Sequence, residues 1–294
     1  MPEGDTIFRA ARTLNRALAG HAVIRFETQL PQLARIDEDE PIKGRTVEKV
    51  DSNGKWLRIY FSDDLILLTH MLMSGSWHIY RPAEGWQRPR VQMRVAIYTE
   101  AFTAVAFQVP IAEFHTGATL ARHRSVLNVG RDVLAPEFDA AVAISQIRSR
   151  PDLEVGEALL RQHLLAGLGN VFKSEVCFAS AVNPFRTVQS LSDAELEALM
   201  ANARKFLMAN ITDGAGDQIV TYTGMRRTTG RGDPSERLWV YKRRGEPCRR
   251  CAAPIVSRKQ GEGARITFWC PNCQKVAAAG KIGDRHEFPP TSFF

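Results

Sequence analysis

Residues 248–273 read CRRCAAPIVSRKQGEGARITFWCPNC and decide the fold of the C-terminal part of the chain. The spacing C-x2-C-x18-C-x2-C lets each cysteine pair reach one metal ion from a tight turn. Two such turns at the ends of a β-hairpin would complete a tetrahedral site, whose ligands are Cys248, Cys251, Cys270 and Cys273. Since four thiolates leave no open coordination position, we expect one structural Zn²⁺; two redox disulfides are the alternative.

The positive charge of the chain is concentrated around this motif. Residues 226–275 contain 13 Lys and Arg against 4 Asp and Glu, whereas the rest of the chain contains 26 against 28. Such a basic segment is typical of a nucleic-acid partner, with a merely solvated surface as the alternative. Four basic residues of this segment are each expected to belong to a solvated face of the protein: Arg249, Arg250, Arg258 and Lys259.

Upstream of the motif the sequence predicts helices. One helix is expected from Asp152 or Glu154 to residue 165, followed by a sharp turn at GLGN (167–170) and a helix over 174–179. Ser192 and Glu195 form a capping box that opens a third helix, ending near residue 220. The stretch 224–233, GMRRTTGRGD, predicts a mobile loop. Cys177 lies in an apolar context and is expected to be a buried small side chain.

The N-terminal part predicts one helix and then β-structure. Asp5 is expected to cap the helix, whose apolar face ends before Gly20. Short apolar and alternating runs follow and favour a sandwich or barrel. The expected strands cover residues 22–28, 56–61, 65–73, 91–98 and 102–109.

Composition excludes several classes of protein. Hydrophobic residues make up 44% and charged residues 24% of 294 residues, which is the composition of a globular protein of two or three domains and not of a disordered chain. No apolar run is long enough to span a membrane, and the N-terminus MPEGDTIFRA does not resemble a secretory signal. We therefore expect a cytoplasmic protein without a membrane partner.

The N-terminus carries a candidate nucleophile. Because proline is small, Met1 should be removed, which leaves Pro2 with a free secondary amine. An α-amino group titrates near ~8, so a neutral fraction that can attack an aldehyde-like carbon exists at pH 7. Glu3 is adjacent and can donate or accept a proton. By itself this pattern is weak, since many chains begin in the same way.

Five segments together resemble the formamidopyrimidine-DNA glycosylase/endonuclease VIII family, closest to its endonuclease VIII branch. They occur in the expected order over nearly the whole chain: MPEGDTI, NGKWLRIYF, THMLMSGSW, LLAGLGNVFKSEVCFASAVNPFR and VYKRRGEPCRRC…ITFWCPNCQ. The resemblance implies a bifunctional DNA glycosylase and abasic-site lyase of base-excision repair. It also implies an α+β multidomain fold, with an N-terminal β-sandwich and flanking helices, a helix–two-turn–helix domain and a C-terminal zinc-finger hairpin.

The resemblance also implies roles for single residues. Pro2 would attack C1′ of the damaged nucleotide, Glu3 would assist sugar ring opening, and Lys55 would contact phosphate and assist catalysis. Asn170 would bind a backbone phosphate, and Arg265, five residues before Cys270, would grip the phosphates that flank the lesion. The purely structural alternative for Lys55 is a surface lysine at the end of a strand. For Asn170 it is the N-cap residue of a helix.

An enzyme that acts on a base inside a duplex must extrude the nucleotide and fill the gap. Leu72 and Met73 in THMLMSGSW are the candidate wedge residues, and Met73 matches the family better. Alternatively both are core strand residues, in which case alternation would let only one face inward. His70 is expected to orient the loop.

The sequence departs from the family pattern in two places. The family usually has Pro-Glu after PEG, but this chain has Asp5 and Thr6, so the glutamate of the first helix is missing. The purine-specific branch carries an Asp-Pro-Arg-Arg-Phe-Gly-type loop, and the corresponding region here reads FQVPIAEFH (107–115). The absence of this loop, together with PEG at the N-terminus, favours oxidised pyrimidines as substrates. An oxidised-purine glycosylase and a non-catalytic zinc-dependent DNA-damage-binding module are the alternatives.

The expected domains follow from these segments. Residues 1–125 would form the catalytic sandwich, 126–235 the DNA-binding helices with the mobile loop, 236–275 the zinc finger and 276–294 a tail. The partner would be double-stranded DNA that contains damaged bases or abasic sites, bound by a monomer.

Overall fold

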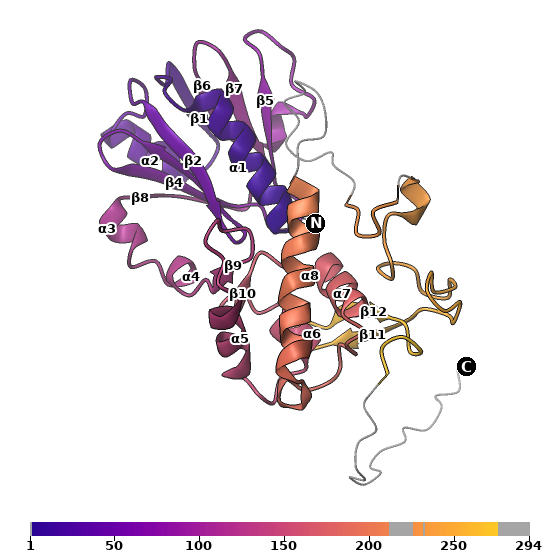
Figure 1. Cartoon of the computed structure of the whole chain (residues 1–294). Helices are drawn as coiled ribbons and strands as arrows, with labels where there is room; N and C mark the ends of the chain where they lie inside the picture. Colours follow the sequence, from indigo (N-terminus) through magenta and orange to yellow (C-terminus); the bar gives the residue numbers. More distant parts are fainter. Residues whose placement is uncertain (1, 212–225, 232, 276–294) are drawn as a thin grey trace, which may run out of the picture.

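The computed structural model describes residues 2–211, 226–231 and 233–275 of the chain. It consists of a β-sandwich, a helical part and a hairpin that packs on the helical part (Figure 1). The expected mobile loop lies partly, and the 276–294 tail wholly, outside the described residues, as does the expected helix end near 220.

The N-terminal part contains two four-stranded antiparallel sheets. One sheet has the order β2-β3-β4-β8 and the other has the order β1-β6-β7-β5. The first comprises β2 (Val47–Asn53), β3 (Trp56–Phe61), β4 (Leu65–His70) and β8 (Ile111–His115). The second comprises β1 (Arg25–Thr28), β6 (Met93–Tyr98), β7 (Thr103–Phe107) and β5 (Ser76–Tyr80).

Helix α1 (Gly4–Leu18) lies against β2 and contributes to the core between the two sheets. Its buried positions Ile7, Ala11, Leu14 and Leu18 are the apolar face that the sequence predicts. A second helix, α2 (Pro31–Asp39), packs against β1 and β8. The sequence therefore identified the sandwich correctly but missed β2, β5, β8 and α2.

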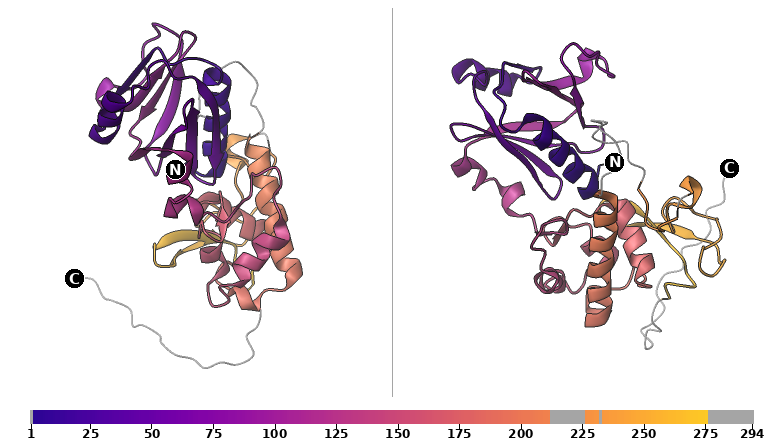
Figure 2. Two further views of the ribbon diagram at one scale, coloured as in Figure 1. Left: turned by 90° about the vertical axis from the view of Figure 1, so that its left-hand side faces the viewer. Right: turned by 45° about the horizontal axis from the view of Figure 1, so that its top comes forward.

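The helical part is assembled around a separate core that includes Phe172, Val176 and Leu199. Its main helices are α5 (Ala140–Arg148), α6 (Val155–Ala158), α7 (Asn170–Ala179) and α8 (Asp193–Ile211). Short elements connect it to the sandwich: α3 (Gly117–Leu120), α4 (Arg124–Leu127) and the parallel pair β9 (Arg131–Asp132) and β10 (Leu165–Ala166). Helix α8 contacts α1, α5 and α7, so it joins the two halves (Figures 1 and 2).

Strands β11 (Val256–Gln260) and β12 (Arg265–Trp269) form the antiparallel hairpin that the cysteine spacing predicts. The hairpin packs against α7 through β12. A small core of Phe178, Val240, Ile255 and Phe268 surrounds the two buried cysteines. Of the helices in the described ranges, none is both long and apolar enough to cross a membrane.

Several predicted boundaries are wrong for identifiable reasons. Glu3, and not Asp5, is the N-cap residue of α1, because Asp5 already lies inside the first helical turn. Only residues 155–158 of the predicted 152–165 helix are α-helical, whereas α7 begins at Asn170, four residues before the predicted start. The 65–73 strand ends at His70, and the 91–98 strand begins at Met93 after a 3₁₀ turn.

The capping box of α8 is confirmed. The backbone N–H of Glu195 donates to Ser192 Oγ at 3.2 Å, and the backbone N–H of Ser192 donates to Glu195 Oε2 at 2.9 Å. The sequence could predict this capping box because its two interacting residues lie within one stretch of four residues.

Candidate active site at the junction of the three parts

Glu3 is a fully buried titratable group at the start of the described chain. Its side chain is 0% exposed, and its carboxylate accepts hydrogen bonds from the backbone N–H groups of Val171 at 2.9 Å and Phe172 at 3.3 Å. These donors belong to the first turn of α7, whose positive dipole end stabilises a carboxylate. Burial nevertheless raises the pKa of Glu3, and the charges of Arg226 and Lys55 oppose that shift.

Glycines allow Glu3 to approach α7 so closely. A Cβ built on Gly169 would lie 2.3 Å from the Glu3 carboxyl carbon, so no larger residue fits there without a shift. The backbone N–H of Gly4 donates to the carbonyl of Gly167 at 2.8 Å, and Gly167 has a positive φ of 97° that suits glycine. The turn 167–170 thus fixes the N-terminal segment, and Pro2 precedes Glu3 there with a partly exposed side chain.

Lys55 reaches the same region from the turn between β2 and β3. The backbone N–H of Gly54 donates to Asp132 Oδ2 at 2.7 Å, which holds this turn against β9. Burial lowers the pKa of Lys55; Glu3 opposes the shift, and the cations of Arg265 and Arg226 add to it. Sequence reasoning missed Asp132, because nothing in its neighbourhood marks it as the support of a turn 78 residues away.

A cavity of about 320 Å³ brings Lys55, Asn170 and Arg265 together from the three parts of the chain. Its lining also contains Gly169, which contacts Glu3 on its other side. Arg265 lies at the start of β12 with an exposed side chain. The lining also contains Glu157 and Glu262, which both pair with Arg161. The cations of Lys55 and Arg265 and the amide of Asn170 are the lining groups that suit an anionic ligand.

Asn170 is more than a possible ligand group. It is the first residue of α7 rather than its N-cap, and its Nδ2 donates to the carbonyl of Ile266 in β12 at 2.8 Å. The contact links the helix to the hairpin that carries Arg265. Since Glu3 accepts from the next two N–H groups, an additional anion here would depend on Asn170 Nδ2 and the surrounding cations.

Asp5 and Thr6, the two residues that depart from the family pattern, both contact Arg226. The guanidinium donates to Asp5 through Nε and Nη2, each at 2.9 Å, and to Thr6 Oγ1 at 3.0 Å. Asp5 is fully buried, so the ion pair is shielded from solvent. Sequence reasoning missed Arg226, which lies in the part of the chain expected to be a mobile loop.

Leu72 and Met73 lie in a turn after β4 and are both exposed, at 44% and 61%. The alternative that they are core strand residues is therefore wrong, because the chain turns at Leu72, which has a positive φ of 44°. Nδ1 of His70 accepts a hydrogen bond from the Leu72 N–H at 3.1 Å, which confirms that His70 orients the loop. Burial and the charge of Lys55 lower the pKa of His70 to about 4, so the ring is neutral at pH 7.

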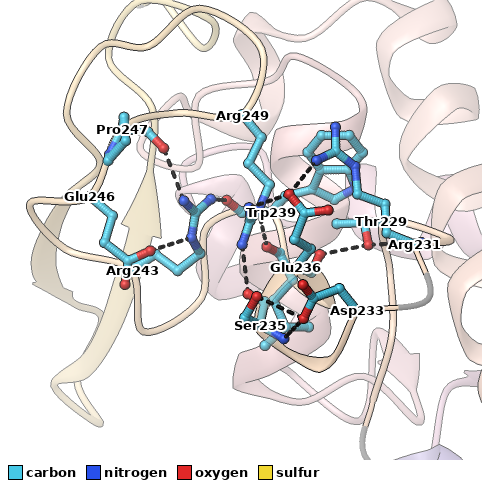
Figure 3. Close-up of polar contacts among 11 residues, drawn as sticks. Thr229, Arg231, Asp233, Ser235, Glu236, Trp239, Arg243, Glu246, Pro247 and Arg249 are labelled. Carbon is cyan, nitrogen blue, oxygen red and sulfur yellow. Dashed lines mark hydrogen bonds and ion pairs between the residues drawn. The ribbon is translucent and has the colours of Figure 1, made fainter.

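Arg243, before the cysteine motif, and Arg249, within it, are engaged within the protein (Figure 3). Arg243 donates to the carbonyls of Trp239 and Pro247 at 2.6 and 2.9 Å, and Arg249 donates to that of Ser235 at 2.8 Å. Arg249 is only 13% exposed, so the expected solvated face is wrong for this residue. The expectation holds for the exposed Lys259. Arg250 and Arg258 are also exposed, but Arg250 donates to the carbonyl of Phe178 at 3.1 Å, and the Arg258 guanidinium lies 3.8 Å from the centroid of the Phe185 ring.

The four cysteines have the geometry of a zinc site. Their sulfur atoms all lie within 4.8 Å of one another, with 3.9 Å between Cys248 and Cys273 and 3.5 Å between Cys251 and Cys270. A tetrahedral ion with Zn–S bonds of ~2.3 Å separates its ligands by about 3.8 Å. The donor set therefore fits one structural Zn²⁺, as the sequence predicts. Cys177 is fully buried, and burial raises its pKa to about 12.

Replacing Cys248 with serine should unfold the hairpin, because a structural zinc site supplies folding free energy of order 10 kcal/mol. We expect loss of the zinc bound by the cysteines and proteolytic cleavage within residues 245–275, while the sandwich stays intact. Zinc analysis and limited proteolysis followed by mass spectrometry measure both effects. Cys177→Ser is the matched control and should keep the same zinc content as the wild type; an intact hairpin in Cys248→Ser that has lost one zinc per chain would contradict the assignment.

Comparison with known proteins identifies all three parts. Residues 1–110 match the formamidopyrimidine-DNA glycosylase N-terminal domain, residues 129–221 the H2TH domain of the same enzyme, and residues 245–276 a zinc finger found in FPG and IleRS.

Full-length relatives and a solved structure agree with these matches. The probable endonuclease 8 2 of Streptomyces coelicolor is 39% identical, covering 97% of this chain and 99% of the relative. The DNA-(apurinic or apyrimidinic site) lyase Nei2 of Mycolicibacterium smegmatis is 33% identical, covering 94% and 100%. A crystal structure of Lactococcus lactis Fpg with DNA that contains an abasic site has a similar fold, with a TM-score of 0.78 and 21% identity over 94% of this chain and 100% of that one.

Proposed function

The chain belongs to the formamidopyrimidine-DNA glycosylase/endonuclease 8 family, and on this basis we propose a bifunctional repair enzyme that excises oxidised pyrimidines from duplex DNA and nicks the abasic site. The observation that carries the proposal is the buried Glu3 carboxyl next to Pro2, beside a cavity lined by Lys55, Asn170 and Arg265. Family membership supports the glycosylase and lyase activities. The pyrimidine preference and the residue roles are our own proposals.

The first step forms a covalent bond at Pro2. After removal of Met1, the neutral secondary amine of Pro2 attacks C1′ of the damaged nucleotide. The bond from C1′ to the base breaks, and the base leaves with the bonding electron pair and takes up the proton that the Pro2 nitrogen loses. The C1′–O4′ bond then opens, O4′ takes a proton from Glu3, and an iminium remains between Pro2 and C1′. Burial of Glu3 supports this role, since a raised pKa keeps a proton available closer to neutral pH.

The iminium makes the sugar prone to elimination. Loss of a C2′ proton expels the 3′-phosphate, and a second, δ-elimination expels the 5′-phosphate. Hydrolysis of the remaining imine returns Pro2 as a free amine. Lys55, Asn170 and Arg265 would hold the phosphates on both sides of the nucleotide, where Arg265 can bind bidentately. Such contacts position the DNA but do not select sequence.

The structure around the site is consistent with a DNA cleft between the two halves. The cavity draws its lining from the sandwich, the helices and the hairpin, which are also the three parts in our proposed division at residues 125, 235 and 275. We further propose that the enzyme acts as a monomer in the cytoplasm, as a member of a bacterial repair family that includes Escherichia coli endonuclease 8.

Lesion preference can be tested with matched oligonucleotides. Under single-turnover conditions we expect faster excision of thymine glycol than of 8-oxoguanine, by tenfold or more, because no loop of the purine-specific type follows β7. Faster excision of 8-oxoguanine would support the purine alternative. Absence of excision and of nicking at an abasic site would support the non-catalytic binding module.

Truncating the proposed wedge should separate the two activities. We expect Met73→Ala to slow base excision about tenfold, because an apolar wedge helps to compensate the few kcal/mol that unstacking costs. Nicking of a preformed abasic site should change little, since no base must be extruded. Ile24→Ala, another exposed apolar residue at 46%, is the matched control. Equal loss of both activities in Met73→Ala would contradict the wedge role.

A further inference from the structure

A second cluster of potential metal ligands lies on the sandwich, apart from the cysteines. Glu113 and His115 belong to β8, and His123 lies between α3 and α4. The Nε2 atoms of His115 and His123 each lie 3.2 Å from the same oxygen, Oε2 of Glu113. All three ligand atoms lie within 4.8 Å of one another. Two imidazoles and one carboxylate thus converge on one point.

The separations fit adjacent ligands of one metal ion. Adjacent ligands of a tetrahedral zinc ion with bonds of ~2.0 Å are about 3.3 Å apart. Both N–O distances are 3.2 Å, which agrees with this value and also lies at the long end of the ~2.7–3.2 Å range of N–H···O hydrogen bonds. The cysteine site shows the same correspondence, since its sulfur separations bracket the value for zinc thiolates.

The residues around the cluster hold its ligands in place. Nδ1 of His115 lies 3.4 Å from Thr119 Oγ1, and Thr119 itself belongs to the capping box of α3 with Thr116. The His123 ring is edge-on to the rings of Trp56 and His115, with distances between ring centroids of 5.7 Å and 5.1 Å. Nδ1 of His123 is buried without a hydrogen-bond partner among the described residues, so Nε2 provides the polar contact of this ring.

The side chains of Glu113, His115 and His123 are exposed enough for a cation to reach them. The side chains of His115 and His123 are 15% and 20% exposed, whereas Glu113 is 43% exposed. The two histidine side chains therefore lie mostly inside the protein, and the Glu113 side chain faces solvent. A water molecule can complete four-coordination from that direction, as in other three-ligand sites.

We propose that Glu113, His115 and His123 bind a divalent cation of the zinc class, in addition to the zinc of the four cysteines. Imidazole and carboxylate ligands suit this class of ion. The cation would fasten the 116–123 segment to β8 and thereby support the face of the sandwich on which Trp56 lies next to Lys55. The proposal does not depend on the catalytic proposal, because it concerns binding alone.

Equilibrium dialysis of the untagged full-length protein against Zn²⁺, with zinc measured by mass spectrometry, tests the site. We expect two zinc ions per chain in the wild type and one in His115→Ala and in His123→Ala. His163→Ala, an exposed histidine elsewhere, is the matched control and should keep two. The circular dichroism spectrum and melting temperature of each variant report that the sandwich is folded.

The absorption spectrum of bound Co²⁺ distinguishes the proposed site from the four-cysteine site. Adding Co²⁺ to protein whose cysteines hold zinc should produce visible d–d absorption without a thiolate charge-transfer band. Glu113→Gln should weaken this binding by tenfold or more. One zinc per chain in the wild type, or a second zinc that survives both histidine substitutions, would overturn the proposal and leave the cluster as hydrogen-bonded side chains only.

Discussion

A chain that keeps one extra residue in front of Pro2 is expected to lose strand nicking by at least about 10³-fold, on the scale by which losing a nucleophile lowers enzyme rates. The extra residue converts the Pro2 nitrogen from an amine into an amide. The lone pair of an amide is delocalised into the carbonyl and cannot attack C1′. Glu3, Lys55 and Arg265 are unchanged in such a chain, so affinity for duplex DNA should stay close to that of the wild type.

A cleavable tag provides the matched pair of proteins. One protease site leaves Pro2 at the terminus and another leaves a single glycine before it, and intact mass identifies each product. Rates are compared on an abasic-site duplex under single-turnover conditions. Undiminished nicking by the glycine-extended protein would show that another amine does the chemistry, and Lys55 would be the next candidate.

The second large effect is expected at Glu3. Glu3→Gln should lower the rate of excision by ~10²–10⁴-fold, the usual contribution of a positioned general acid or base. The amide keeps the shape of the side chain and can still accept a hydrogen bond from α7, but it cannot give a proton to O4′. Glu100→Gln, at an exposed turn, is the matched control. Wild-type excision rates in Glu3→Gln would contradict the role.

The pH dependence of stability provides an independent check on Glu3. Burial raises the pKa of Glu3 in the folded protein, so folding favours the protonated form. Its contribution to stability is therefore present at acidic pH and is lost as the pH rises through the folded-state pKa. At neutral pH, Glu3→Gln should unfold at the same temperature as the wild type or higher. A clearly lower melting temperature would mean that the charged carboxylate stabilises the fold.

Local signals in the sequence were sufficient for several features. The cysteine spacing predicted both the hairpin and its metal site, and the Ser192–Glu195 capping box predicted the start of α8. In each case the interacting groups are close in the sequence or repeat a spacing set by coordination geometry. The resemblance to a family added residues such as Lys55, Asn170 and Arg265, which the structure places on one cavity.

The sequence did not predict features that depend on contacts between residues far apart in the chain. Glu3 meets α7 across 168 residues, and Asp5 meets Arg226 across 221 residues. The sequence assigned Asp5 to helix capping, and it could not reveal a partner 221 residues away. The turn at Leu72 was hidden in an apolar run that favours a strand, and it required a backbone conformation that apolar residues seldom adopt.

Arg226 contacts both residues that depart from the family pattern. Asp5 and Thr6 bind its guanidinium, which also lies 5.4 Å above the ring of Phe172, whose backbone N–H donates to Glu3. The cation is therefore held near the proposed acid and lowers the pKa that burial raises. The two departures from the family pattern thus form one contact beside the site.

The most direct test of the central claim is to locate the covalent bond. The wild-type protein is mixed with an abasic-site duplex, the imine is reduced with borohydride, and the trapped complex is digested and sequenced by mass spectrometry. We predict that the deoxyribose remnant is attached to the α-nitrogen of the N-terminal peptide that begins with Pro2. Attachment to a lysine side chain, or no trapped complex from protein that nicks the duplex, would contradict the account.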